Sequence, residues 1–127
     1  MMIADASAAL TALLNAGSAR EALGSEQLHV PHLIDPEIAN GLRRMVVSGE
    51  VESGAGRAVL GTWRRIGVVR YPIVGLLGRI WELRENLSTY DASYVALAEQ
   101  LGCALLTADR RLSRAPGVGC PITLVPG

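Results

Sequence analysis

The chain has 127 residues, half of them hydrophobic, which is enough for one domain with a substantial core. Twelve basic residues balance twelve acidic ones, and every basic residue is arginine, so any mechanism that requires a lysine is excluded. This argues against two classes of aspartate-bearing α/β protein, the receiver domains and the haloacid-dehalogenase-type phosphotransferases, which typically use a lysine near the phosphoryl group.

No hydrophobic run approaches the roughly 20 residues that a membrane-spanning helix needs. The first residues, "MMIADASAAL", have no basic stretch and reach an acidic residue at Asp5, which argues against a signal peptide. The two cysteines, Cys103 and Cys120, do not make a disulfide framework and are expected to be small buried hydrophobic residues. We therefore expect a cytoplasmic protein without a membrane segment.

The first half of the chain alternates short strands with helices. Pro31 ends the second strand, and the next helix has Asp35 at its cap and Pro36 at its first position. In chain order, the expected elements are a strand over 2–5, a helix over 6–17, a short helix over 19–24, a strand over 28–31 and a helix over 34–49.

The second half continues this alternation. Gly54, Gly56 and Gly61 disfavour a helix over 51–67, although its remaining pattern is helical. The expected elements after it are a strand or extended link over 68–72, helices over 73–86 and 89–102, a strand over 103–109, a short helix over 110–115 and a strand over 121–127.

The predicted strands are short, apolar and without alternation, which is typical of a parallel sheet covered on both faces. We therefore expect an α/β fold in which a parallel β-sheet is flanked by α-helices. The chain contains no repeat or linker, so residues 1–127 are expected to form a single domain. In such sheets, ligands gather at the carboxyl ends of the strands.

Four acidic residues are placed to meet at that edge. Asp5 and Asp109 lie at the carboxyl ends of predicted strands, while Glu37 and Asp91 lie in the first turns of predicted helices. Taken singly, each is more often a helix cap than a metal ligand. Four close carboxylates repel one another unless a cation neutralises them, and Mg²⁺ or Mn²⁺ suits oxygen ligands. The spacing alone leaves both interpretations open.

The sequence resembles a PIN-domain ribonuclease, and in particular the VapC-type toxins of bacterial toxin–antitoxin pairs. The resemblance lies in "IADASAAL" at the start, "PEIANGLRR" at 36–44, "LSTYDASYVALAEQLGCALLTADRRL" at 87–112 and the closing strand. The third block is the longest and most specific. The middle, 46–86, matches only in being helical and rich in glycine, so it says little about the substrate.

The resemblance implies a PIN-like fold and a metal-dependent endoribonuclease toxin. It implies that Asp5, Glu37, Asp91 and Asp109 are the catalytic residues and hold Mg²⁺ or Mn²⁺, with Asp5 and Asp91 as the principal ligands. It also implies an RNA substrate, a cognate VapB-like antitoxin and a homodimer. Two alternatives stay open: a non-catalytic PIN-like module that binds RNA or a partner, and a nuclease that acts on DNA.

Three polar residues lie at distances that suit support of the acids. Ser7 lies two residues after Asp5, and Thr107 two residues before Asp109, so both hydroxyls are candidates to bond site carboxylates or metal-bound water. Local turn or cap bonding accounts for them equally well. Asn40 lies one helical turn from Glu37 and is expected to hold its carboxylate.

The net charge of zero conceals a basic remainder. When the four proposed ligands are set aside, eight acidic residues face twelve arginines, which leaves a charge of +4. The arginines that follow Glu37 and Asp109 in sequence are candidates to bind RNA phosphates; they are Arg43, Arg44, Arg110, Arg111 and Arg114. Five aromatic residues and no phenylalanine argue against a base-stacking platform, so we expect recognition through shape and backbone contacts.

Overall fold

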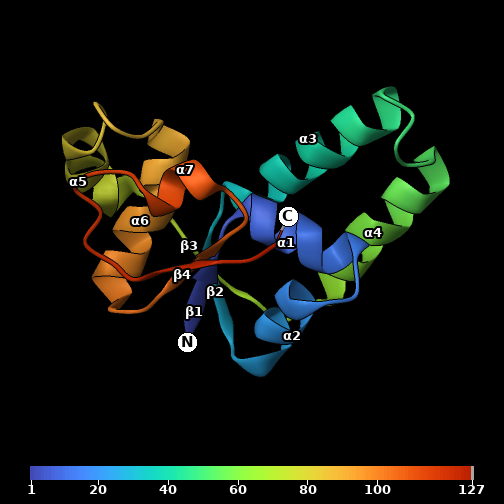
Figure 1. Cartoon of the computed structure of the whole chain (residues 1–127), viewed down its shortest axis with the longest axis horizontal. Coiled ribbons are helices and arrows are strands. Elements are labelled where there is room, and N and C mark those ends of the chain that lie inside the picture. Colours follow the sequence, from blue (N-terminus) through green and yellow to red (C-terminus); the bar gives the residue numbers. More distant parts are fainter. Residues whose placement is uncertain (127) are drawn as a thin grey trace.

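A five-stranded sheet, parallel throughout, forms the centre of the computed structural model, which describes residues 1–126 (Figure 1). The strand order is β3-β2-β1-β4-β5, so β1 is the middle strand. The strands are β1 (Met2–Ala4), β2 (Leu28–Pro31), β3 (Val69–Tyr71), β4 (Leu105–Thr107) and β5 (Ile122–Leu124). The predicted α/β fold with a parallel sheet and flanking helices is confirmed.

Helices lie on both sides of the sheet (Figure 1). Along the chain they are α1 (Ala6–Leu14), α2 (Ser18–Ser25), α3 (Ile34–Val47), α4 (Ser53–Arg65), the 3₁₀ helix η1 (Val74–Leu76), α5 (Leu77–Glu82), α6 (Thr89–Leu101) and α7 (Arg110–Ser113). The first four gather on one side, where α3 and α4 form an arm that extends away from the sheet, and α5, α6 and α7 lie on the other.

The order of the strands creates a crevice beside β1. The chain runs outward from β1 to β2 and β3, then returns to place β4 on the opposite side of β1. Such a reversal leaves a crevice at the carboxyl ends of the two central strands, because the connections leave in opposite directions. Asp5 directly follows β1, and Asp109 follows β4 by two residues.

Helix α6 fixes the second side of this crevice. Its residues from Ala92 to Ala98 are all buried, and it packs against β1, β2 and β4. The small alanines in this run let the helix lie close to the sheet. Gly102 ends it in a left-handed conformation with φ of 66°, as the predicted glycine stop requires.

The prediction that Asp35 caps a helix is wrong. Helix α3 begins at Ile34, so Asp35 already lies inside its first turn. Its carboxylate accepts hydrogen bonds from Trp63 Nε1 at 2.7 Å and from Arg70 Nε and Nη2 at 2.8 and 3.0 Å. An ion pair with β3 and a bond to α4 satisfy this carboxylate, so it is not available as a cap.

Two other helices differ from the prediction. The helix expected over 73–86 is broken into η1, α5 and a following turn. The helix over 53–65 forms despite its glycines, and Gly56 has a packing role: a Cβ atom there would lie 3.3 Å from Val46 Cγ2 of α3. Within residues 1–126, no helix has both the length and the hydrophobicity needed to cross a membrane.

Candidate functional site

Asp5 is the most buried acidic residue of the crevice, with 5% of its surface exposed. It is the N-cap of α1: its Oδ1 accepts hydrogen bonds from the Ala8 amide at 2.9 Å and from Ser7 Oγ at 2.6 Å. Its Oδ2 accepts one from Thr107 Oγ1. Burial raises the pKa of Asp5 despite these three bonds, each of which lowers it.

The hydrogen bonds predicted for Ser7 and Thr107 are therefore present. Ser7 Oγ also accepts a bond from the Ala108 amide at 3.0 Å, and Thr107 Oγ1 accepts one from the Asp109 amide at 3.0 Å. The two hydroxyls thus join the start of α1 to the end of β4. Asp5 is held by a network that spans the crevice.

Asp109 is the N-cap of the short helix α7. Its Oδ1 accepts a bond from the Arg111 amide at 2.9 Å, and the Arg111 guanidinium lies 3.1 Å from its Oδ2. These bonds outweigh the effect of burial and lower the pKa of Asp109, whereas at Asp5 burial outweighs the hydrogen bonds and raises the pKa. Arg111, predicted to bind RNA, is thus already paired with a site acid, although its side chain is 90% exposed.

Glu37 extends into the crevice from the first turn of α3. Its Oε1 accepts a hydrogen bond from Tyr94 Oη of α6, and not from Asn40 as predicted. Burial raises the pKa of Glu37, and the nearby charges of Asp91 and Asp5 raise it further against the Tyr94 bond. Asn40 lies one turn further along α3 and lines the same pocket as Glu37, without a hydrogen bond to it.

Tyr94 is the site residue that sequence reasoning missed. It is 1% exposed and lies three residues after Asp91, so both side chains leave the same face of α6. This spacing was a usable signal, but its partner Glu37 is 57 residues away in the chain. Only the fold, which brings the first turn of α3 to the crevice opposite α6, shows that the hydroxyl reaches a carboxylate.

Asp91 lies in the first turn of α6, where Ser88 is the N-cap and accepts a bond from the Asp91 amide at 3.1 Å. Burial raises the pKa of Asp91, and the charges of Asp5 and Asp109 raise it further. The charge of at least one other acid therefore raises the pKa of Asp5, Glu37 and Asp91, and Asp109 acts on two of these three. All four acids come from different elements of the chain.

The donor set suits a hard divalent cation held partly through water. Across residues 1–126, no three His, Cys, Asp or Glu side chains converge closely enough to hold one ion directly. The Asp5 oxygens are turned toward hydroxyls, and Asp109 is turned toward Arg111. Mg²⁺ keeps several waters and needs only one or two protein carboxylates, so a site whose acids reach the ion partly through water fits it.

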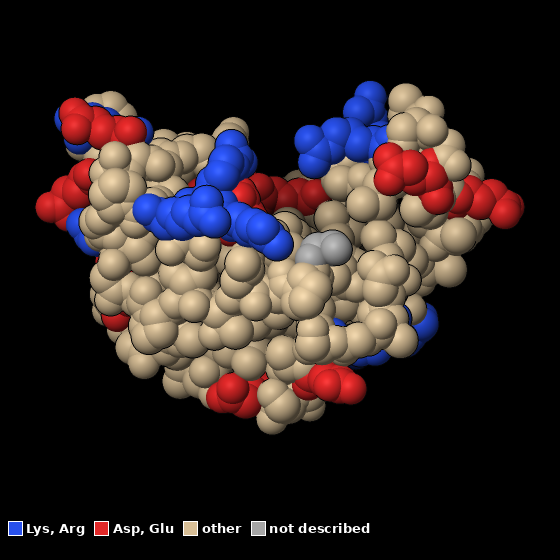
Figure 2. Space-filling view, viewed as in Figure 1, with Lys and Arg blue, Asp and Glu red and all other residues tan. Residues whose placement is uncertain are grey.

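The surface around the crevice has the opposite charge. Figure 2 shows a notch between the two groups of helices, with acidic atoms on its floor and basic atoms, all arginine in this chain, on both rims. One rim lies over α7 and the other over the α3 arm (Figures 1 and 2). The predicted RNA-binding residues Arg43, Arg44, Arg110 and Arg111 belong to these two elements.

The PIN domain family model matches residues 2–118. The chain therefore belongs to the PIN-domain family, and within it to the VapC-type ribonucleases. It is 61% identical over 126 residues to the VapC ribonuclease Mb0985 of Mycobacterium bovis, which covers 99% of both chains.

Solved structures agree with the fold. PAE2754 from Pyrobaculum aerophilum is 28% identical, with a TM-score of 0.73 over 95% of this chain and 81% of that one. VapBC2 from Rickettsia felis, bound to a DNA fragment from its promoter, has a TM-score of 0.71 over 97% of both chains. At 12% identity, the second likeness speaks for the fold alone.

Proposed function

We propose that this chain is a Mg²⁺- or Mn²⁺-dependent endoribonuclease toxin of a toxin–antitoxin pair, acting as one PIN domain in the cytoplasm. One observation carries the proposal: four acids from four separate elements interact electrostatically at the crevice beside β1. Three of them have raised pKa values, because burial and neighbouring carboxylates disfavour their charged forms, and a bound cation would relieve this.

Each group of residues at the crevice has a separate role in the proposed hydrolysis of the phosphodiester bond. A divalent cation, when bound here, would supply an acidified water and offset charge on the phosphate oxygens. Asp5 and Asp91 would be its principal ligands, and Glu37 and Asp109 would complete the site directly or through water. Ser7, Thr107 and Tyr94 hold two of the four carboxylates in place. The arginines of both rims bind phosphates on either side of the cleaved bond.

The second candidate is a PIN-like module that binds RNA or a partner without cutting. The presence of all four acids argues against it, because a surface that only binds the RNA polyanion gains nothing from four carboxylates. A nuclease that acts on DNA uses the same acids, so only a direct comparison of substrates separates it from a ribonuclease.

The test is incubation of the purified chain with total RNA, with and without Mg²⁺, followed by mapping of the new ends. Discrete cleavage is expected with Mg²⁺ or Mn²⁺, much less with Ca²⁺, whose looser coordination holds geometry less well, and none with chelator. A matched DNA sample should stay intact. Cleavage that survives exhaustive chelation would refute the metal-dependent mechanism.

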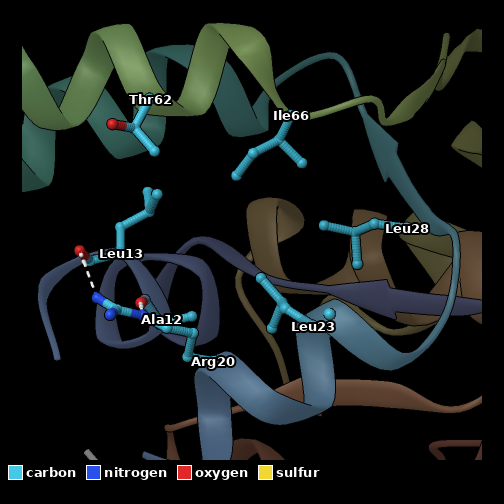
Figure 3. Close-up of a pocket in the computed structure, with 8 residues that line it drawn as sticks. Ala12, Leu13, Arg20, Leu23, Leu28, Thr62 and Ile66 are labelled. Carbon is cyan, nitrogen blue, oxygen red and sulfur yellow. Dashed lines mark hydrogen bonds between the residues drawn. The ribbon is translucent and has the colours of Figure 1, made fainter. Parts of the chain in front are cut away.

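A VapB-like antitoxin has an apolar groove to occupy. A pocket of about 470 Å³ lies between α1, α2 and α4, with Leu13, Leu23 and Ile66 projecting into it (Figure 3). Arg20 closes one end, where its guanidinium donates to the carbonyls of Ala12 and Leu13. We propose that an apolar helix of the antitoxin binds here, because such a groove suits an amphipathic helix.

A second apolar surface suits the proposed homodimer. Val74, Leu77 and Trp81 are 74%, 53% and 63% exposed on η1 and α5, beside a pocket of about 500 Å³. We call these three residues the α5 patch. Clustered exposed side chains of this size are typical of interaction sites. The α5 patch lies on the opposite side of the sheet from the groove of Figure 3, so both partners can bind together.

A further inference from the structure

A groove of about 610 Å³ leads away from the acidic site along α3. Glu37 lies at the end nearest the other acids, and Leu10 and Pro36 contribute apolar lining. Its walls also include Asn40, Arg44 and Tyr90. A groove of this size, mostly apolar with a few convergent polar groups, is typical of a site for a small molecule or one unit of a polymer.

Tyr90 is the aromatic residue at this groove. It directly precedes Asp91 in sequence, and 64% of its surface is exposed. Across residues 1–126 its hydroxyl has no hydrogen-bond partner in the protein, unlike those of Tyr71 and Tyr94. A large aromatic ring left open beside a phosphodiester-cleaving site offers a face on which a base can stack.

Asn40 and Arg44 follow Glu37 on the same face of α3, at spacings of three and seven residues. Arg44 lies about 10 Å from Glu37 along the helix axis, from the rise per residue. Arg70, Arg79 and Arg111 are each paired with a carboxylate, whereas in the part of the chain that the structure describes Arg44 has no ion pair. Asn40 likewise offers an amide that both donates and accepts.

We propose that this groove binds one unpaired nucleotide of the RNA, next to the phosphodiester that is cut. Its base stacks on the Tyr90 ring and is hydrogen-bonded by the Asn40 amide, and Arg44 binds the phosphate beyond it. The proposal rests on the ribonuclease function and deepens it, because it names the residues that hold one nucleotide beside the cleaved bond. A base paired in a helix keeps its stacking partners and cannot enter the groove.

This position of Tyr90 changes the expectation drawn from composition. Five aromatic residues do not make an extended stacking platform, but one placed beside the acids is enough for one base. Recognition by shape and backbone then applies to the flanking arginines, and base contact to this groove alone.

The test uses an eight-nucleotide uridine RNA with 2-aminopurine at its centre, alone or paired with its complement. Binding is measured with Ca²⁺ in place of Mg²⁺ to limit cleavage, and RNA integrity is checked on a gel. Tyr90→Ala should weaken single-strand binding about tenfold and abolish quenching of the 2-aminopurine fluorescence, since one stacked base is lost. Tyr90→Phe keeps the ring and should stay within about twofold of the unaltered chain.

Asn40→Ala should weaken the same binding about fivefold, as expected for one lost hydrogen bond. Duplex binding should be unchanged in all three variants. The proposal is overturned if Tyr90→Ala leaves single-strand binding intact, or if it weakens single strand and duplex equally.

The results that would refute this proposal differ from those that would refute the ribonuclease function. Cleavage of total RNA that does not depend on Tyr90 refutes the groove and keeps the nuclease. Quenching that depends on Tyr90, in a chain that never cuts RNA, refutes the nuclease and keeps the groove as a site for single-stranded nucleotides.

Discussion

Carboxylates in this crevice are destabilising until something neutralises them. Asp5, Glu37 and Asp91 all have raised pKa values, caused first by burial and then by the charges of neighbouring carboxylates. A group that is harder to ionise in the folded chain than in the unfolded chain disfavours folding once it is charged. The metal-free chain therefore loses stability from these groups as pH rises through their folded-state pKa values.

Asp91→Asn should remove cleavage and most metal binding but keep the fold. The amide has the same shape as the carboxylate and removes one charge from the cluster, so repulsion falls. We expect the melting temperature of the metal-free variant to be unchanged or up to about 3 °C higher. Paired assays of RNA cleavage and thermal unfolding check this. Full activity in a folded variant would exclude Asp91 from the site.

Tyr94→Phe should weaken metal binding through Glu37. Removal of the hydroxyl frees the Glu37 carboxylate, and loss of an orienting partner typically costs about tenfold in metal affinity. Titration with Mn²⁺ measures this directly. The same change in a Glu37→Gln background should have little further effect, because the two residues act as one unit. If Tyr94→Phe weakened Mn²⁺ binding equally in the unaltered chain and in Glu37→Gln, Tyr94 would act on the fold and not through Glu37.

Residues near the strand ends were the predictable part of the site. Ser7 lies two residues from Asp5, a distance that local geometry fixes, and its bond to that carboxylate is present. Thr107 also bonds a site carboxylate, but this is Asp5 at the end of the neighbouring strand and not the nearby Asp109. Tyr94 and the pairing of Arg111 with Asp109 depend on how helices pack and how exposed side chains turn. Sequence spacing does not encode either.

The α3 arm is fixed at its base by one carboxylate. Asp35 binds the indole of Trp63 from α4 and the guanidinium of Arg70 from β3, so three elements meet at it. Trp63 is 2% exposed, and its N–H finds its partner in Asp35. This contact holds Glu37, two residues further along α3, at its place beside the crevice.

Asp35→Asn should make stability less dependent on acid pH. The Arg70 bond lowers the pKa of Asp35, so its stabilising effect is present above the unfolded value of about 4 and is lost as pH falls through the folded value. At pH 7 the variant should be about 1 kcal/mol less stable, since the pair is partly exposed. Denaturant unfolding across pH 2–7 should show this difference closing below pH 4. A constant difference would contradict it.

At the level of elements, periodicity located each helix but not its limits. Helix α3 begins one residue before Asp35, because the ion pair with Arg70 takes the carboxylate that would otherwise cap it. The helix expected over 73–86 is divided, and the glycines of α4 are tolerated where they allow close contact with α3. Tertiary contacts set these helix boundaries, and local helix propensity alone does not predict them.

The molecule as a whole carries two apolar surfaces besides its acidic site, and one of them adjoins the nucleotide groove, because Tyr90 lines both that groove and the pocket beside the α5 patch. The α5 patch lies on one side of the sheet, and the groove between α1, α2 and α4 on the other. Trp81→Ser should convert a dimer into a monomer in sedimentation experiments, because the largest side chain of the patch is lost. Its melting temperature in dilute solution should barely change. A variant that remains dimeric would place the interface elsewhere.

The last prediction concerns control of the ribonuclease. An enzyme that cuts cellular RNA harms its host, so a cognate antitoxin should be encoded beside it and should bind the groove of Figure 3.

Thr62 lines that groove from the exposed surface of α4, so Thr62→Arg should block the antitoxin without disturbing the fold. Gln100→Arg adds the same charge at an exposed position of α6 and serves as the control. On co-expression, the neighbouring open reading frame should co-purify with the unaltered chain and with Gln100→Arg and should suppress RNA cleavage, but it should do neither for Thr62→Arg. If the neighbour neither binds nor inhibits the unaltered chain, and the chain alone is harmless when expressed, the toxin function is wrong even though the fold is right.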